Sequence, residues 1–67
     1  MRPASEYVVL DKEVDFYTIT HIASLRNEVA LGYKKQEGSN QIITTNPNKN
    51  NKVSFAAKDY IIVIAND

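Results

Sequence analysis

The sequence feature that most constrains the fold is an unbroken apolar run near the end of the chain, Tyr60–Ala65. Its members are all aromatic or aliphatic, and most are β-branched. A strand with one face in water alternates apolar and polar residues, so this continuous run predicts a strand that is covered on both faces. In so short a chain, one cover has to be a helix. The other has to be more of the chain or a second copy.

Length and composition favour the second copy. A chain of 67 residues forms one domain that buries only about 60% of its surface on folding. Domains of this size usually add disulfides, metals or oligomerisation to their cores. The sequence has no cysteine and a single histidine, His21, which excludes disulfides and disfavours a histidine-based metal site. We therefore expect a homodimer.

The charge balance argues against several classes of partner. Eight basic and eight acidic side chains give a formal net charge of zero, whereas nucleic-acid binders usually carry a clear positive excess. The longest apolar run is far shorter than the roughly 20 residues that span a membrane, and the N-terminus lacks the apolar core of a signal peptide. We expect no nucleic-acid partner and no membrane insertion by this segment. The lack of cysteine fits a reducing cytoplasm.

Local patterns predict one helix. Asp15 is the expected N-cap, because its carboxylate can accept from the free amides of the first turn. Apolar residues then recur at helical spacing over residues 16–26. Asn27 follows, a residue type that tolerates the left-handed conformation found just past helix ends. One face of this helix is expected to pack on a sheet.

The remaining patterns predict strands. Residues 1–6 are expected to be a disordered tail or a remnant outside the fold, and residues 7–67 a single domain. The expected strands lie at residues 7–10, 29–35, 41–45 and 60–65, with a very short one possible at 52–54. This order predicts an α+β fold, a small four-stranded mixed sheet with one helix on one face.

The strand at residues 29–35 carries a glycine, Gly32, which usually marks a bulge or a close approach by another backbone or a ligand. Strict alternation places Val29, Leu31 and Tyr33 on one face of this strand. Residues 36–40 are a turn signal, so residues 41–45 should pair back as a hairpin. An exposed loop over residues 46–51 follows.

Few residues suggest chemistry. His21 lies on the predicted helix with no nucleophile motif nearby, so an exposed or partner-facing histidine is the commoner role. Asp11, Glu13 and Asp15 could bind a hard cation, but they lack the glycine and closing glutamate of an EF-hand loop. The lysines beside Tyr33 form either a solvated rim or a small anion-binding patch at a dimer cleft.

The sequence resembles the C-terminal lobe of RCK domains, also called the TrkA-C domain. The resemblance rests on residues 27–34, then Asn46 and Pro47, then residues 55–64. The motif Ala-Leu-Gly-Tyr followed by Asn-Pro is especially similar to the corresponding segments of CASTOR/POLLUX-type ion channels. The resemblance as a whole covers roughly residues 7–66. Lys58 departs from the pattern, since the family usually has glycine before the aspartate at this turn. The dinucleotide-binding lobe typical of such proteins is not in this sequence.

This resemblance implies a cytoplasmic, non-enzymatic, homodimeric regulatory module of a potassium or other cation channel or transporter. Some members of this family bind a cyclic dinucleotide or other anion between two lobes and many have no known ligand, so the resemblance leaves the ligand unknown, with a nucleotide or other anionic regulatory ligand as one candidate. Pro47 matches the family motif near that cleft, and Tyr33, Lys35 and Asn46 are expected to flank the same end of the hairpin. The alternative is a structural or protein-interaction domain without a small-molecule ligand.

Overall fold

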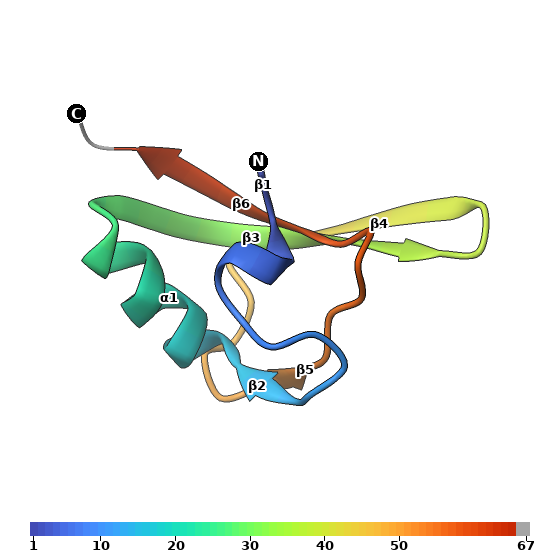
Figure 1. Cartoon of the computed structure of the whole chain (residues 1–67), viewed down its shortest axis with the longest axis horizontal. Helices are drawn as coiled ribbons and strands as arrows, with labels where there is room; N and C mark the ends of the chain where they lie inside the picture. Colours follow the sequence, from blue (N-terminus) through green and yellow to red (C-terminus); the bar gives the residue numbers. More distant parts are fainter. Residues whose placement is uncertain (66–67) are drawn as a thin grey trace.

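One helix packs on one face of a four-stranded sheet in the computed structural model, which describes residues 1–65 (Figure 1). The predicted α+β class is confirmed. The predicted domain end at residue 67 lies outside the described residues. In chain order the elements are β1 (Arg2–Pro3), the 3-10 helix η1 (Ala4–Glu6), β2 (Val14–Asp15), α1 (Phe16–Leu25), β3 (Glu28–Glu37), β4 (Asn40–Thr45), β5 (Lys52–Val53) and β6 (Tyr60–Ala65).

The main sheet has the order β1-β6-β3-β4, and every neighbouring pair is antiparallel. The prediction of a mixed sheet was therefore wrong. The error comes from the strand predicted at residues 7–10, because these residues form turns instead. The place beside β6 is taken by β1, which pairs Arg2 with Ile61. A separate two-stranded ribbon pairs β2 with β5 on the same side of the sheet as α1 (Figure 1).

The N-terminal residues are part of the fold, which corrects the expectation of a disordered tail. Ala4 is completely buried, and its amide donates to the Asp59 carbonyl oxygen at 3.0 Å. The buried Glu28 carboxylate accepts from the Tyr7 hydroxyl at 2.5 Å and pairs with the Arg2 guanidinium at 3.0 Å. Burial and then this hydrogen bond raise the pKa of Tyr7 to about 12. These contacts fasten the segment to β3 and β6.

The helix begins as the sequence predicts. The Asp15 carboxylate accepts from the Thr18 amide at 2.8 Å and from the Thr18 hydroxyl at 2.6 Å. These bonds satisfy a free donor of the first turn and lower the pKa of Asp15. The helix ends at Leu25, one residue earlier than predicted, with Asn27 in the left-handed region at φ 60°.

A bulge in β3 decides which side chains enter the core. Ala30 pairs with Val63 and Gly32 with Ile62, so Leu31 is an extra residue in the ladder. The bulge shifts the alternation by one residue. Tyr33 therefore shares the helix-covered face with Ala30, and not with Val29 as strict alternation predicted.

The strand β6 is covered on one face by this chain. Ile61 is completely buried against the helix side, whereas Ile64 on the opposite face is 54% exposed. Within one copy, the predicted cover is therefore present on the helix side of β6 and missing on the opposite side. The buried apolar core is small and consists of Ala4, Tyr7, Phe16, Ile19, Ala23, Phe55 and Ile61.

Gly32 marks a close backbone approach, as the sequence predicts. A Cβ at this position would lie 2.0 Å from the Thr44 carbonyl oxygen and 2.9 Å from the Thr45 Cα. Gly38 has a different role. It is the first residue of a two-residue hairpin loop between Glu37 and Asn40, with φ 59°, and no atom lies within 4 Å of its added Cβ.

Replacing Gly32 by alanine should destabilise the fold by about 3 kcal/mol or more, because β3 and β4 would have to separate. Urea unfolding of Gly32→Ala and of the control Gly38→Asn measures this. The control should cost about 1 kcal/mol or less, since asparagine tolerates the left-handed region. Equal losses in the two variants would contradict the close approach at Gly32.

Candidate functional site

Two of the predicted ligand residues are used inside the fold. The Tyr33 ring lies between Phe16 and Phe55, with its centroid 5.4 Å from that of Phe55 in an edge-on arrangement. The Lys35 ammonium pairs with the Asp59 carboxylate at 3.2 Å and donates to the Ser54 carbonyl oxygen. Both side chains therefore hold β3 to the segment that precedes β6.

The other two predicted ligand residues follow β4. The exposed Asn46 has φ 50°, and its amide donates to the Leu31 carbonyl oxygen at 2.8 Å. Pro47 is half-buried. Leu31 and Lys35 are four residues apart on β3, a separation of about 13 Å. Within residues 1–65, no hydrogen bond or ion pair joins the side chains of Tyr33 and Lys35 to Asn46 or Pro47. Their binding of a ligand stays a prediction.

Asp59 has a structural role that its local sequence did not predict. Its buried carboxylate accepts from the Ala56 amide at 2.8 Å, the Gln36 amide at 2.9 Å and the Lys35 ammonium at 3.2 Å. It thereby closes the turn before β6 and fixes that turn to β3. The available signal was a lone carboxylate directly before an apolar strand. Lys58 is not among the residues with positive φ, so the turn holds a lysine without strain.

The stability of the fold should depend on Asp59 ionisation. Burial, the largest single influence, raises the pKa of Asp59, but the hydrogen bonds from Ala56, Gln36 and Lys35 together hold this pKa below its ordinary value of 3.8. A carboxyl group with a lowered folded-state pKa stabilises the fold above its unfolded pKa and loses this contribution as the pH falls through the folded value.

We therefore expect Asp59→Asn to lower the free energy of unfolding at pH 7 by about 1–3 kcal/mol. It should also weaken the decline of stability below the unfolded-state pKa of 3.8. Denaturant unfolding across an acid pH series measures both effects. Glu37→Gln, which neutralises an exposed carboxylate on β3, is the control and should leave the acid decline unchanged. An undiminished acid decline in Asp59→Asn would contradict the role of Asp59.

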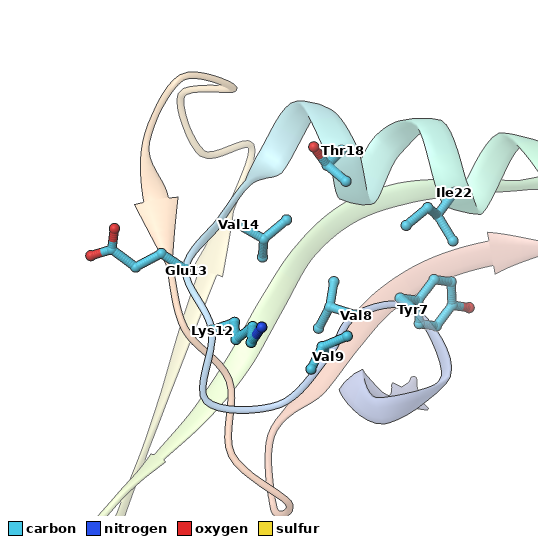
Figure 2. Close-up of a pocket in the computed structure, with 8 residues that line it drawn as sticks. All are labelled: Tyr7, Val8, Val9, Lys12, Glu13, Val14, Thr18 and Ile22. Carbon is cyan, nitrogen blue, oxygen red and sulfur yellow. The ribbon is translucent and has the colours of Figure 1, made fainter.

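An open groove of about 320 Å³ lies between the loop over residues 7–14 and helix α1 (Figure 2). Val8, Val9 and Ile22 turn toward this space, whereas the Glu13 carboxylate points away from it (Figure 2). The lining residues are Tyr7, Val8, Val9, Lys12, Glu13, Val14, Thr18 and Ile22. The groove can hold a small apolar group. The Tyr7 hydroxyl at its edge is already bonded to Glu28.

The predicted metal and catalytic candidates are not gathered into a site. Asp15 is engaged in capping α1 through Thr18, and Asp11 has φ 65° in a loop. Among residues 1–65, no group of three or more His, Asp or Glu side chains is placed to hold a metal ion. His21 lies on the exposed side of α1.

Within residues 1–65, no helix or strand covers the sheet face opposite α1, which we call the outer face (Figure 1). Its residues follow from the strand register and are Val29, Gly32, Lys34 and Gln36 on β3, Gln41, Ile43 and Thr45 on β4, and Tyr60, Ile62 and Ile64 on β6. Helix α1 and the β2–β5 ribbon both lie on the other side of the sheet (Figure 1). Val29, Ile43 and Ile64 are 47%, 60% and 54% exposed. The single charge, the Lys34 ammonium, lies 5.0 Å from the centre of the Tyr60 ring.

Comparisons with models of protein families, with curated proteins and with solved structures find no match to this chain. Within residues 1–65, no helix has the length and apolar character needed to cross a membrane, since α1 has ten residues.

Proposed function

We propose that this chain is a non-catalytic self-association domain, in which two copies pack through their outer faces. The observation that carries the proposal is the composition of that face. It bears one charge among ten positions, and its Val29, Ile43 and Ile64 side chains are 47%, 60% and 54% exposed. Soluble proteins rarely leave a contiguous apolar surface of this kind exposed, and such surfaces mark interaction sites.

A second copy suits this face because the surface is complementary to itself. A two-fold axis brings the same patch of both copies together, so a single-sign charge cluster would repel. Here the one cation, Lys34, lies against the Tyr60 ring, and the remaining positions are uncharged. A strongly acidic or basic partner would find this one charge alone on the surface. Another apolar sheet face fits it best.

The size of the face limits the contact to a small interface. Strand β3 has ten residues and β4 and β6 have six each, so at about 3.4 Å per residue and about 4.8 Å per strand the three strands cover about 360 Å². Two such faces would bring together about 700 Å², which is below the about 1,000 Å² of stable specific interfaces and places the contact in the weak class. The cover would also enlarge a core that is small in one copy, which is the usual remedy in chains of this length.

The double substitution Val29→Glu with Ile64→Lys tests the proposal. The two residues are direct cross-strand partners, so the new side chains attract each other within one copy and the strand pair is retained. Burying these charges between two copies is unfavourable. We expect the dissociation constant of self-association to rise at least about 100-fold, equivalent to about 2.7 kcal/mol.

Sedimentation equilibrium over a range of concentrations measures this constant. The control is Leu25→Lys, which adds a charge at an apolar position of α1 that is even more exposed, at 74%. The control should associate as the wild type does. A wild type and a double variant of the same mass at every concentration would contradict the outer-face contact.

A narrower candidate function is regulation of a channel or transporter, with the outer-face dimer binding an anionic ligand in the cytoplasm. The observation that favours it is the turn at Asp59, where the resembled family has its Gly-Asp motif and where this chain builds a buried hydrogen-bond centre. In such a module, a ligand alters the parent protein only by binding one arrangement of the two copies better than another.

Thermal unfolding in the presence of nucleotides, inorganic anions and cations tests this candidate. A specific ligand at 100 times its dissociation constant adds about 2.7 kcal/mol, which raises the Tm of a domain this small by roughly 10–20 °C. The shift should grow with ligand concentration. If the Tm stays constant across the series while self-association is intact, the ligand-binding regulatory function is rejected and the self-association function is retained.

A further inference from the structure

We propose that the free edge of β4 is a second interface, at which β4 of another copy pairs antiparallel about a two-fold axis centred on Ile43. This inference does not depend on the outer-face contact, because it rests on the backbone of β4. Strand β4 lies at the end of the sheet order and pairs with β3 alone. An unpaired edge presents a row of free N–H and C=O groups, which are a template for another strand.

The register shows which groups are free. Residues of an antiparallel ladder alternate between those bonded to the neighbouring strand and those facing away from it. The Asn46 amide donates to the Leu31 carbonyl oxygen at 2.8 Å, which sets the phase of this alternation. Counting back from Asn46, the backbone groups of Thr44 and Ile42 face β3. Those of Thr45, Ile43 and Gln41 face outward.

Strand β4 carries none of the usual protection against pairing. Edge strands commonly hold lysine, proline, a bulge or very few residues. The opposite edge of this sheet follows that rule, since β1 has two residues, Arg2 and Pro3. By contrast, β4 is six residues long with the sequence Asn-Gln-Ile-Ile-Thr-Thr, and it contains no charge, no proline and no glycine. A segment of this composition pairs readily with other strands.

The outward residues are complementary to themselves. With Ile43 opposite Ile43 of the second copy, Gln41 faces Thr45 on each side, and three residue pairs exchange backbone hydrogen bonds. Their side chains all lie on the outer face, because Ile43 and Thr45 pair with Lys34 and Gly32. The outer faces of the two copies thus become one continuous surface. With the outer-face contact also formed, the assembly is a tetramer with two kinds of two-fold interface.

Amide hydrogen exchange of the wild type tests the pairing directly. The amides of Ile43 and Thr45 should be protected to nearly the same degree as those of Ile42 and Thr44, at least about 100-fold relative to an unfolded chain. This protection should fall on dilution for the outward amides of Gln41, Ile43 and Thr45, and not for those of Ile42 and Thr44. Fast exchange of Ile43 and Thr45 beside slow exchange of Ile42 and Thr44 at high concentration would overturn the proposal.

The variant Gln41→Pro removes an outward amide and no bond to β3, since proline is accepted at edge positions whose N–H faces solvent. It should restore fast exchange at Ile43 and Thr45 and halve the mass of the assembly. Gln41→Val, which keeps the amide, should behave as the wild type. If Gln41→Pro does not fold, Ile43→Lys replaces it, because it keeps every amide while opposing two lysines across the axis. Continued protection of Thr45 in that variant would overturn the pairing.

Combination with the outer-face variant separates the two proposals. If both interfaces form, Val29→Glu with Ile64→Lys and Gln41→Pro each leave a dimer, and together they leave a monomer. If the outer-face proposal fails and the edge holds, Gln41→Pro alone gives the monomer. If Gln41→Pro changes neither the mass nor the exchange at Ile43, the edge proposal is overturned whatever the outer face does.

Discussion

The extra residue in β3 is the constraint on which the rest of the structure depends. Strand β3 is the centre of the fold, since it pairs with β4 and β6 and packs against α1. Leu31 shifts the side-chain alternation between Ala30 and Gly32. Tyr33 consequently meets Phe16 and Phe55 in the core, while Val29 faces outward beside Ile64. The same shift completes the core and produces the apolar outer face.

Two buried carboxylates hold the chain around this centre. Glu28, at the start of β3, accepts a hydrogen bond from Tyr7 and pairs with Arg2, and so fastens the N-terminal segment. Asp59, before β6, receives two amides and Lys35 and so closes the opposite end. Both oxygens of each buried carboxylate have a hydrogen-bond or ion-pair partner, because an unpaired buried charge is costly. In a chain with few buried apolar residues, these polar contacts near the two ends of β3 thus help to fix the fold.

Local signals in the sequence identify the elements whose causes are local. Asp15 caps α1, Asn27 follows it in the left-handed region, and Gly32 lies where two backbones approach. Residues 7–10 have strand propensity, yet the Tyr7 and Val8 amides donate to the Ala4 carbonyl oxygen at 2.9 and 3.1 Å and turn the chain. The Tyr7 hydroxyl bond to Glu28, 21 residues away, anchors the start of this segment. The bulge at Leu31 and the bonds of Asp59 depend on partners from other strands. Tyr33 and Lys35 were predicted ligand residues for the same reason, because their internal partners become visible only in the folded chain.

We propose that a second copy covers the outer face. Isotope-filtered nuclear Overhauser spectroscopy on a mixture of labelled and unlabelled protein tests this contact. We expect intermolecular contacts from the methyl groups of Val29, Ile62 and Ile64 to apolar side chains of the partner, and none from Leu25. Methyl groups of the outer face that contact water alone, in a sample whose mass remains that of a 7.6 kDa monomer, would contradict it.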